Sequence, residues 1–133
     1  MCTITPTVDL GLIQNQTVEL YRPYDIPRRW HTRVGKRQAC KVNVDGDLDQ
    51  AVDAQIVMVT WNGVAADEIG INNQMVAEKV GKNHDLSHDF LQVPVDFIQP
   101  GLNSLYTFST TTHHGIEVQW PGMVLLVKYD APE

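Results

Sequence analysis

The sequence predicts an all-β protein, an antiparallel β-sandwich of eight or nine strands with at most one short helix. Three observations lead to this prediction. Apolar and polar residues alternate with a period of two along most of the chain, which is the pattern of half-buried strands. Turn-forming residues recur roughly every ten residues. The 133 residues, 43% of them hydrophobic, are enough for one core, so we expect a single domain over residues 1–133.

The expected strands begin near the N-terminus. Ile4, Val8 and Leu10 alternate with polar residues, and Pro6 shares their register, which favours a strand at the edge of a sheet. The other expected strands cover residues 18–24, 34–44, 51–61, 67–72, 90–93, 103–109, 116–120 and 124–129.

Two segments depart from simple alternation. Residues 51–61 are almost continuously apolar and end at Asn62-Gly63, which predicts a central strand covered on both faces. Residues 74–82 are the segment that could be helical, and Gly81 would end such a helix.

The order of segments from residue 51 to residue 129 carries a resemblance. Its clearest part is the pattern VPxxxxxPGxN, which runs from Val93 to Asn103. The chain here resembles the galactose-binding-domain-like jelly-roll β-sandwich of carbohydrate-binding modules. The resemblance implies a jelly roll in which Pro100-Gly101 makes a turn and Asn103 ties the loop to the next strand. Ligand residues vary within that family, so the resemblance assigns none here, whereas a structural calcium ion is typical of the fold.

The charge is unevenly distributed. The net charge is −6, but residues 22–41 carry seven basic groups and one acid, a local balance of +6. The acidic remainder disfavours duplex nucleic acid, which needs many phosphate contacts from one basic face. A local anion site in this basic segment is one interpretation, and a pair of strands whose cations neutralise neighbouring acids is the other.

Connections between strands are expected to alternate between the two ends of the sandwich. This rule gathers residues 25–33, 62–66, 94–102 and 121–122 at one end. It gathers residues 44–50, 73–89 and 110–115 at the other.

The first end carries the candidate ligand-binding residues, Arg28, Arg29, Trp30, Arg33 and Trp61. An indole stacks on the CH face of a pyranose, and Arg reaches hydroxyl, uronate or sulfate groups. Trp30 stands between polar loop residues, so it is the tryptophan that we expect to be exposed. Core packing is the alternative for Trp61, and Trp120 is expected in the core because it shares a register with Ile116 and Val118.

The second end carries four of the five histidines, and we take His84, His88 and His114 as candidate metal ligands. Adjacent residues on a strand point to opposite sides, so only one of His113 and His114 would join a shared site. Solvated loop histidines are the alternative. Three acids, Asp45, Asp47 and Asp49, are similar to a calcium loop but lack its sixth-position glycine and twelfth-position glutamate.

The cysteines suggest no chemistry. Cys2 and Cys40 allow one bridge and lack the CxxC spacing of zinc or redox sites. Cys40 shares an apolar register with Val42 and Val44, which predicts a small buried hydrophobe. No GxSxG motif and no phosphate-binding glycine loop is present. No apolar run approaches the roughly 20 residues of a membrane helix.

These observations favour a non-catalytic carbohydrate-binding domain, with a polysaccharide or oligosaccharide as partner and an acidic polysaccharide as the specific hypothesis. One alternative is a structural or interaction module that self-associates or docks a neighbouring domain. The other is a metal-dependent hydrolase or lyase. Neither nucleic acid nor membrane is expected as a partner. No secretory signal is visible, so we expect a cytoplasmic protein if the chain is complete and an extracellular one if it is an excised module.

Overall fold

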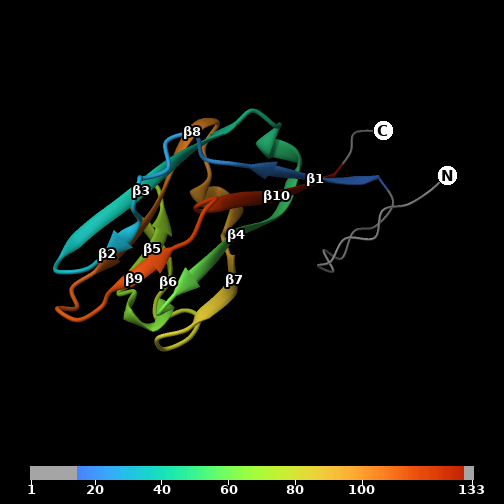
Figure 1. Cartoon of the computed structure of the whole chain (residues 1–133). Coiled ribbons are helices and arrows are strands. Elements are labelled where there is room, and N and C mark those ends of the chain that lie inside the picture. Colours follow the sequence, from blue (N-terminus) through green and yellow to red (C-terminus); the bar gives the residue numbers. More distant parts are fainter. Residues whose placement is uncertain (1–14, 131–133) are drawn as a thin grey trace.

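The computed structural model describes residues 15–130 and shows two antiparallel sheets packed face to face (Figure 1). This confirms the predicted all-β sandwich, with one or two strands more than expected. The described strands are β1 (Gln16–Tyr21), β2 (His31–Thr32), β3 (Lys36–Val44), β4 (Ala51–Trp61), β5 (Glu68–Ile71), β6 (Gln74–Ala77), β7 (Leu86–Gln92), β8 (Gly101–Ser109), β9 (Ile116–Val118) and β10 (Val124–Asp130). The short 3-10 helices are η1 (Leu48–Gln50), η2 (Gly63–Ala65) and η3 (Val95–Phe97).

Residues 15–130 include no helix long and apolar enough to cross a membrane. The strand expected at residues 4–10, and Cys2 with it, lie outside the described residues.

Sheet A is organised around β4. Its order is β1-β10-β4-β9-β2, and β7 pairs with the other edge of β4. Strand β10 pairs with β4 from Ala51 to Val57, and β9 pairs with its last two residues. Sheet B has the order β3-β8-β5-β6. Each sheet buries one face against the other, which is how a sandwich forms its core.

The central strand begins and ends where the sequence predicts, at Ala51 and Trp61. Its burial alternates, however: Ala54, Ile56 and Met58 face the core, while the residues between them are half-buried. The expectation that both faces are covered is therefore wrong. The outward residues of β4 are polar at Asp53 and Gln55 and apolar from Val57 onward, and no further layer of residues 15–130 packs on this side.

The possible helix at residues 74–82 does not form, because residues 74–77 make strand β6. Asn72 and Asn73 both have positive φ angles, 51° and 65°, and they connect β5 to β6 as a two-residue hairpin turn. Asn tolerates this backbone region better than most residues, and two successive positive φ angles are what the favoured hairpin turn requires.

Two loops interrupt sheet A at the same level. Strand β1 pairs with β10, and strand β2 pairs with β9. Residues 22–30 separate β1 from β2, and residues 119–123 separate β9 from β10. The two loops adjoin each other, because the backbone N–H of Val118 donates to the carbonyl of Trp30 at 3.0 Å. Neither loop reverses the chain at an end of the sandwich.

The predicted assignment of loops to ends is wrong in part. Asn62 lies beside the 110–115 loop, since its side chain donates to the carbonyl of Gly115 at 2.8 Å. The 94–102 segment lies at the opposite end, where β8 begins beside the end of β3. The unrecognised strand β6 inverts the direction of every later strand, which is why the alternation rule fails after residue 73.

The core confirms the prediction for Cys40. Its thiol is free and fully buried, and it donates to the carbonyl of Met123 at 3.7 Å. Burial raises the pKa of Cys40 to about 12, so the thiol stays protonated and unreactive near neutral pH.

Candidate functional site

Trp30 is buried, so the expectation that it is exposed is wrong. Only 4% of its surface is accessible, and its indole Nε1 donates to the hydroxyl of Thr107 at 2.7 Å. The hydroxyl of Thr107 also lies 2.8 Å from that of Thr32. Residues 22–30 cross the open side of the sandwich beside β3, and the indole fills the space between the sheets there. Trp30 therefore supports the loop and offers no face to a ligand.

The expectation that Trp120 lies in the core is also wrong. Its side chain is 81% exposed, although its register with Val118 suggested the core. Strand β9 ends at Val118, and the backbone N–H of Gly122 donates to the carbonyl of Gln119 at 2.9 Å. This turn carries Trp120 out of the strand. The Pro121-Gly122 pair that follows was the signal in the sequence that the alternation stops here.

Trp120 and Tyr24 are the two most exposed large hydrophobic side chains among the described residues, and they lie on adjoining loops. Tyr24 is 68% exposed. A Cβ atom on Gly122 would lie only 3.3 Å from Cγ of Pro23 and 3.4 Å from Cγ1 of Ile26, so the two loops are closely packed. We call residues 22–30 and 119–123 the aromatic loop pair.

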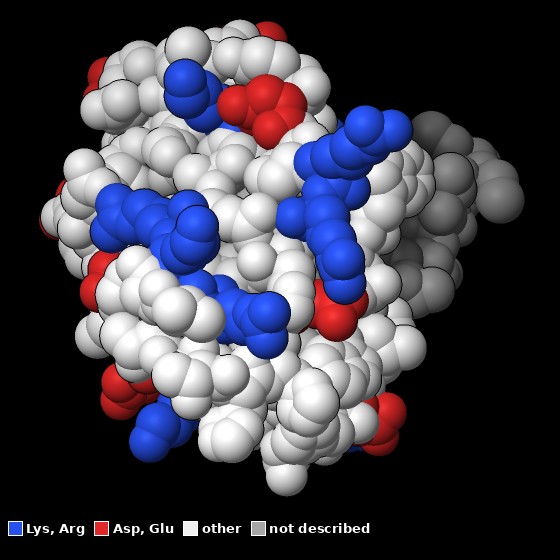
Figure 2. Space-filling view, turned by 60° about the vertical axis from the view of Figure 1, so that its left-hand side comes forward, with Lys and Arg blue, Asp and Glu red and all other residues white. Residues whose placement is uncertain are grey.

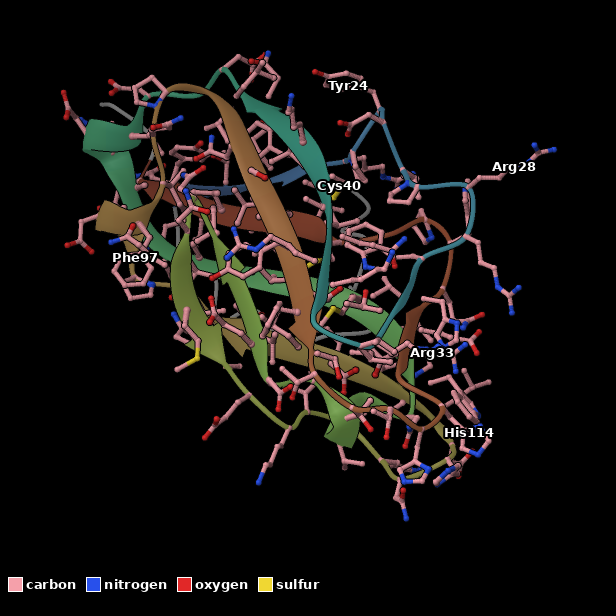
Figure 3. All side chains as sticks on the ribbon, turned by 90° about the vertical axis from the view of Figure 1, so that its left-hand side faces the viewer. Tyr24, Arg28, Arg33, Cys40, Phe97 and His114 are labelled. Carbon is pink, nitrogen blue, oxygen red and sulfur yellow. The ribbon has the colours of Figure 1, made fainter. Side chains whose placement is uncertain are left out.

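Arginines border the aromatic loop pair. Arg28, Arg29 and Arg33 are exposed, as are the other four cations of the basic segment. The loop that carries Arg28 and Arg29 is held against β3, because the carbonyl of Arg29 accepts from the side chain of Gln38 at 2.9 Å. In Figure 3, Tyr24, Arg28 and Arg33 follow one margin of the molecule, and Phe97 lies at the opposite margin.

Most cations of the basic segment have no salt-bridge partner among the described residues. Within residues 15–130 one of these seven cations forms a salt bridge: a guanidinium nitrogen of Arg37 lies 3.7 Å from a carboxylate oxygen of Glu68. Among the described residues the other six cations form no salt bridge, so the interpretation that these cations neutralise neighbouring acids is supported at Arg37 alone. Figure 2, which turns the β2–β3 side of the molecule forward, shows Lys and Arg side chains bordering a broad uncharged area. Unpaired cations around exposed aromatic rings suit a ligand that has both anionic groups and apolar ring faces.

Trp61 lies at another place in the fold. It is half-buried, and its ring makes edge-on contacts with His84 at 5.6 Å and with His114 at 6.1 Å between centroids. Asn62 holds this cluster together, because its side chain accepts from the backbone N–H of His84 at 3.0 Å as well as donating to Gly115. Figure 3 shows His114 far from Tyr24. Trp61 thus lies away from Tyr24, contrary to the loop assignment, whereas Arg33 is near this cluster, because a Cβ atom on Gly115 would lie 2.9 Å from Cβ of Arg33.

The structure brings two of the three candidate metal ligands together. The rings of His84 and His114 are 5.0 Å apart. His88 projects from β7 opposite Val59. Residues 15–130 contain no group of three His, Cys, Asp or Glu side chains placed to hold a metal ion. Asp47, from the calcium-like run, instead caps η1 by accepting from the backbone N–H of Asp49 at 3.0 Å.

The fold and this surface together define a class: an antiparallel β-sandwich domain with exposed aromatic and basic loops. No protein-family model matches the chain. No curated protein matches it either.

Two solved structures show the same fold. One is a β-porphyranase of glycoside hydrolase family 86 from the human gut bacterium Bacteroides plebeius, with 16% identity and a TM-score of 0.62 over 87% of this chain. The other is the glycoside hydrolase BuGH86 in complex with neoagarooctaose, with 13% identity and a TM-score of 0.63 over 85% of this chain. The chain spans about a fifth of either protein, 21% and 19% of their lengths. The similarity is to a β-sandwich that occurs within larger carbohydrate-active enzymes.

Proposed function

We propose that this chain is a non-catalytic carbohydrate-binding domain that holds an acidic polysaccharide on the aromatic loop pair. The observation that carries the proposal is the exposure of Trp120 and Tyr24, 81% and 68%, on adjoining loops bordered by arginines that form no salt bridge within residues 15–130. Neighbouring exposed apolar side chains on a soluble protein often mark a binding site. Because sugar rings have an apolar face, they stack on such side chains.

The arginines support an acidic ligand over a neutral one. Arg28, Arg29 and Arg33 present planar guanidinium groups, which bind carboxylate and sulfate oxygens in pairs. The rest of the chain is acidic, so a polyanion would meet attraction at this margin and repulsion elsewhere. The two structural neighbours support the broader class, since both are glycoside hydrolases.

Binding fits the described residues better than catalysis does. A metal-dependent hydrolase would need a third ligand beside His84 and His114, and residues 15–130 supply none. Cys40, the cysteine among those residues, is buried and protonated.

Native electrophoresis in gels that contain a glycan tests the proposal. The wild-type chain should be retarded by a sulfated galactan or a polyuronate, and Trp120→Ala should run as if no glycan were present. Phe90→Ala is the matched control, because Phe90 is 46% exposed on β7, outside the aromatic loop pair and with β4 between it and Val124. Gels with polyglutamate, an anion without sugar rings, separate stacking from charge alone. Equal retardation of Trp120→Ala and wild type by the sulfated galactan would exclude the site.

A second candidate function has its own observation. The outer face of sheet A has an apolar strip: Val57 of β4 lies between Val124 of β10 and Phe90 of β7, and Leu20 on β1 is 49% exposed. Such a face favours a structural module that docks a neighbouring domain or a second copy. Sedimentation at several concentrations tests self-association, which Phe90→Glu should abolish. A monomer at every concentration would rule out the second copy.

A further inference from the structure

The outer face of sheet B has a hollow of about 260 Å³ near the start of β8. It is smaller than the roughly 300–1,000 Å³ of pockets that enclose a drug-sized ligand, which suits a single sugar ring. Its lining residues are Lys41, Asn72, Gln99, Leu102, Asn103 and Ser104.

The floor of the hollow is fixed by two interlocked amides. The side chain of Asn72 donates to Oδ1 of Asn103 at 2.7 Å and to the carbonyl of Phe97 at 3.0 Å. Asn103 is 1% exposed, and its Nδ2 donates to the carbonyls of Gln99 at 2.7 Å and Gly101 at 3.0 Å. Because these groups bind one another, the hollow keeps its shape without a ligand, which lowers the cost of binding.

The walls of the hollow offer free groups. Among residues 15–130, neither the ammonium of Lys41 nor the hydroxyl of Ser104 has a hydrogen-bond or ion-pair partner. Leu102 adds an apolar surface that is 48% exposed. Arg37, on the same face of β3, is already occupied: it pairs with Glu68, donates to Asn73 at 2.6 Å and lies 3.9 Å above the ring of Tyr106.

The hollow adjoins the aromatic loop pair. The backbone N–H of Lys41 donates to the carboxylate of Asp25 at 2.6 Å, and Asp25 follows Tyr24 in the loop. A polysaccharide that stacks on the aromatic loop pair can therefore continue across β3 into the hollow.

We propose that the hollow is a second subsite for an anionic sugar residue of the same polysaccharide chain. Lys41 binds the carboxylate or sulfate group, Ser104 binds a ring hydroxyl, and Leu102 packs against the CH face of the ring. This inference rests on the proposed function, because the first subsite is the aromatic loop pair.

Calorimetric titration with two lengths of one sulfated galactan tests the inference. A disaccharide should occupy the aromatic loop pair alone, whereas an octasaccharide should also reach the hollow. Lys41→Met should weaken octasaccharide binding about tenfold, the loss expected for one charge-assisted hydrogen bond, and leave disaccharide binding within twofold. Ser104→Ala should act in the same direction with a smaller effect.

Lys36→Met is the matched control, since Lys36 is an exposed lysine on the same strand, at the end remote from the hollow. It removes the same charge and should change octasaccharide binding by less than twofold. Equal effects of Lys41→Met and Lys36→Met would overturn the second subsite while the wild-type binding and its loss in Trp120→Ala stand. No binding of either length to the wild type would overturn the proposed function and the subsite with it.

Discussion

The burial of Trp30 and the exposure of Trp120 predict opposite effects of the same substitution. Trp30→Ala empties a site that is 4% exposed and removes the hydrogen bond to Thr107. Truncating a buried tryptophan costs about 3–5 kcal/mol, a large share of the roughly 5–15 kcal/mol that stabilises a domain. For a chain of this size that is a fall in Tm of roughly 10–20 °C. Trp120→Ala should change the free energy of unfolding by less than about 0.5 kcal/mol.

Chemical denaturation followed by circular dichroism measures both variants. If Trp30→Ala does not fold, Trp30→Phe keeps the comparison possible. It loses the hydrogen bond and part of the ring while Thr107 retains Thr32 as a partner, so we expect a cost of about 1–3 kcal/mol. Trp30→Phe should also bind glycan within twofold of wild type. A Trp30→Ala variant as stable as Trp120→Ala would refute the reasoning about this loop.

Three other predictions follow from the described residues. Val34 is a β-branched residue at φ 58° in the turn before β3, so Val34→Asn should raise the free energy of unfolding by about 1 kcal/mol in thermal melts; no gain over the surface control Val52→Asn would contradict this. Burial raises the pKa of Cys40 and of Tyr106 to about 12 each. At alkaline pH the folded state therefore holds protons that the unfolded state releases, so the free energy of unfolding should fall as the pH rises above about 9. Cys40→Ala should reduce that slope by up to about 1.4 kcal/mol per pH unit between pH 9 and 12, and an unchanged slope in urea titrations would argue against a buried thiol. Binding of a sulfated galactan should weaken more than about tenfold between 0.05 and 0.5 M salt, while any binding of neutral neoagarooctaose should not; equal salt dependence in calorimetry would count against ion pairing.

The strand pattern could be predicted where burial on one face repeats every second residue. The bounds of β4 follow from its apolar run and from the Asn62-Gly63 pair after it. Strand β6 could not be recognised in the same way, because two of its four residues are exposed and two are half-buried. Its short sequence carries no alternation, and the Asn72-Asn73 turn before it was the available signal. The galactose-binding-like jelly roll stays a prediction.

The sequence predicts the exposed arginines of the candidate site, but it does not predict which tryptophan is exposed there. Exposure of Arg28 and Arg33 follows from their charge, since burying an unpaired cation is costly. The burial of Trp30 depends on how residues 22–30 cross the side of the sandwich, which is a tertiary contact. The exposure of Trp120 depends on where β9 ends, and a period of two does not reveal where a strand ends.

The indole N–H signals of the three tryptophans provide the most direct test that the aromatic loop pair is the binding surface. Two-dimensional NMR resolves them, and Trp→Phe variants assign them to Trp30, Trp61 and Trp120. Addition of a sulfated oligogalactan should shift the signal of Trp120 and leave that of Trp30 in place. A shift at Trp61 without one at Trp120 would contradict the account.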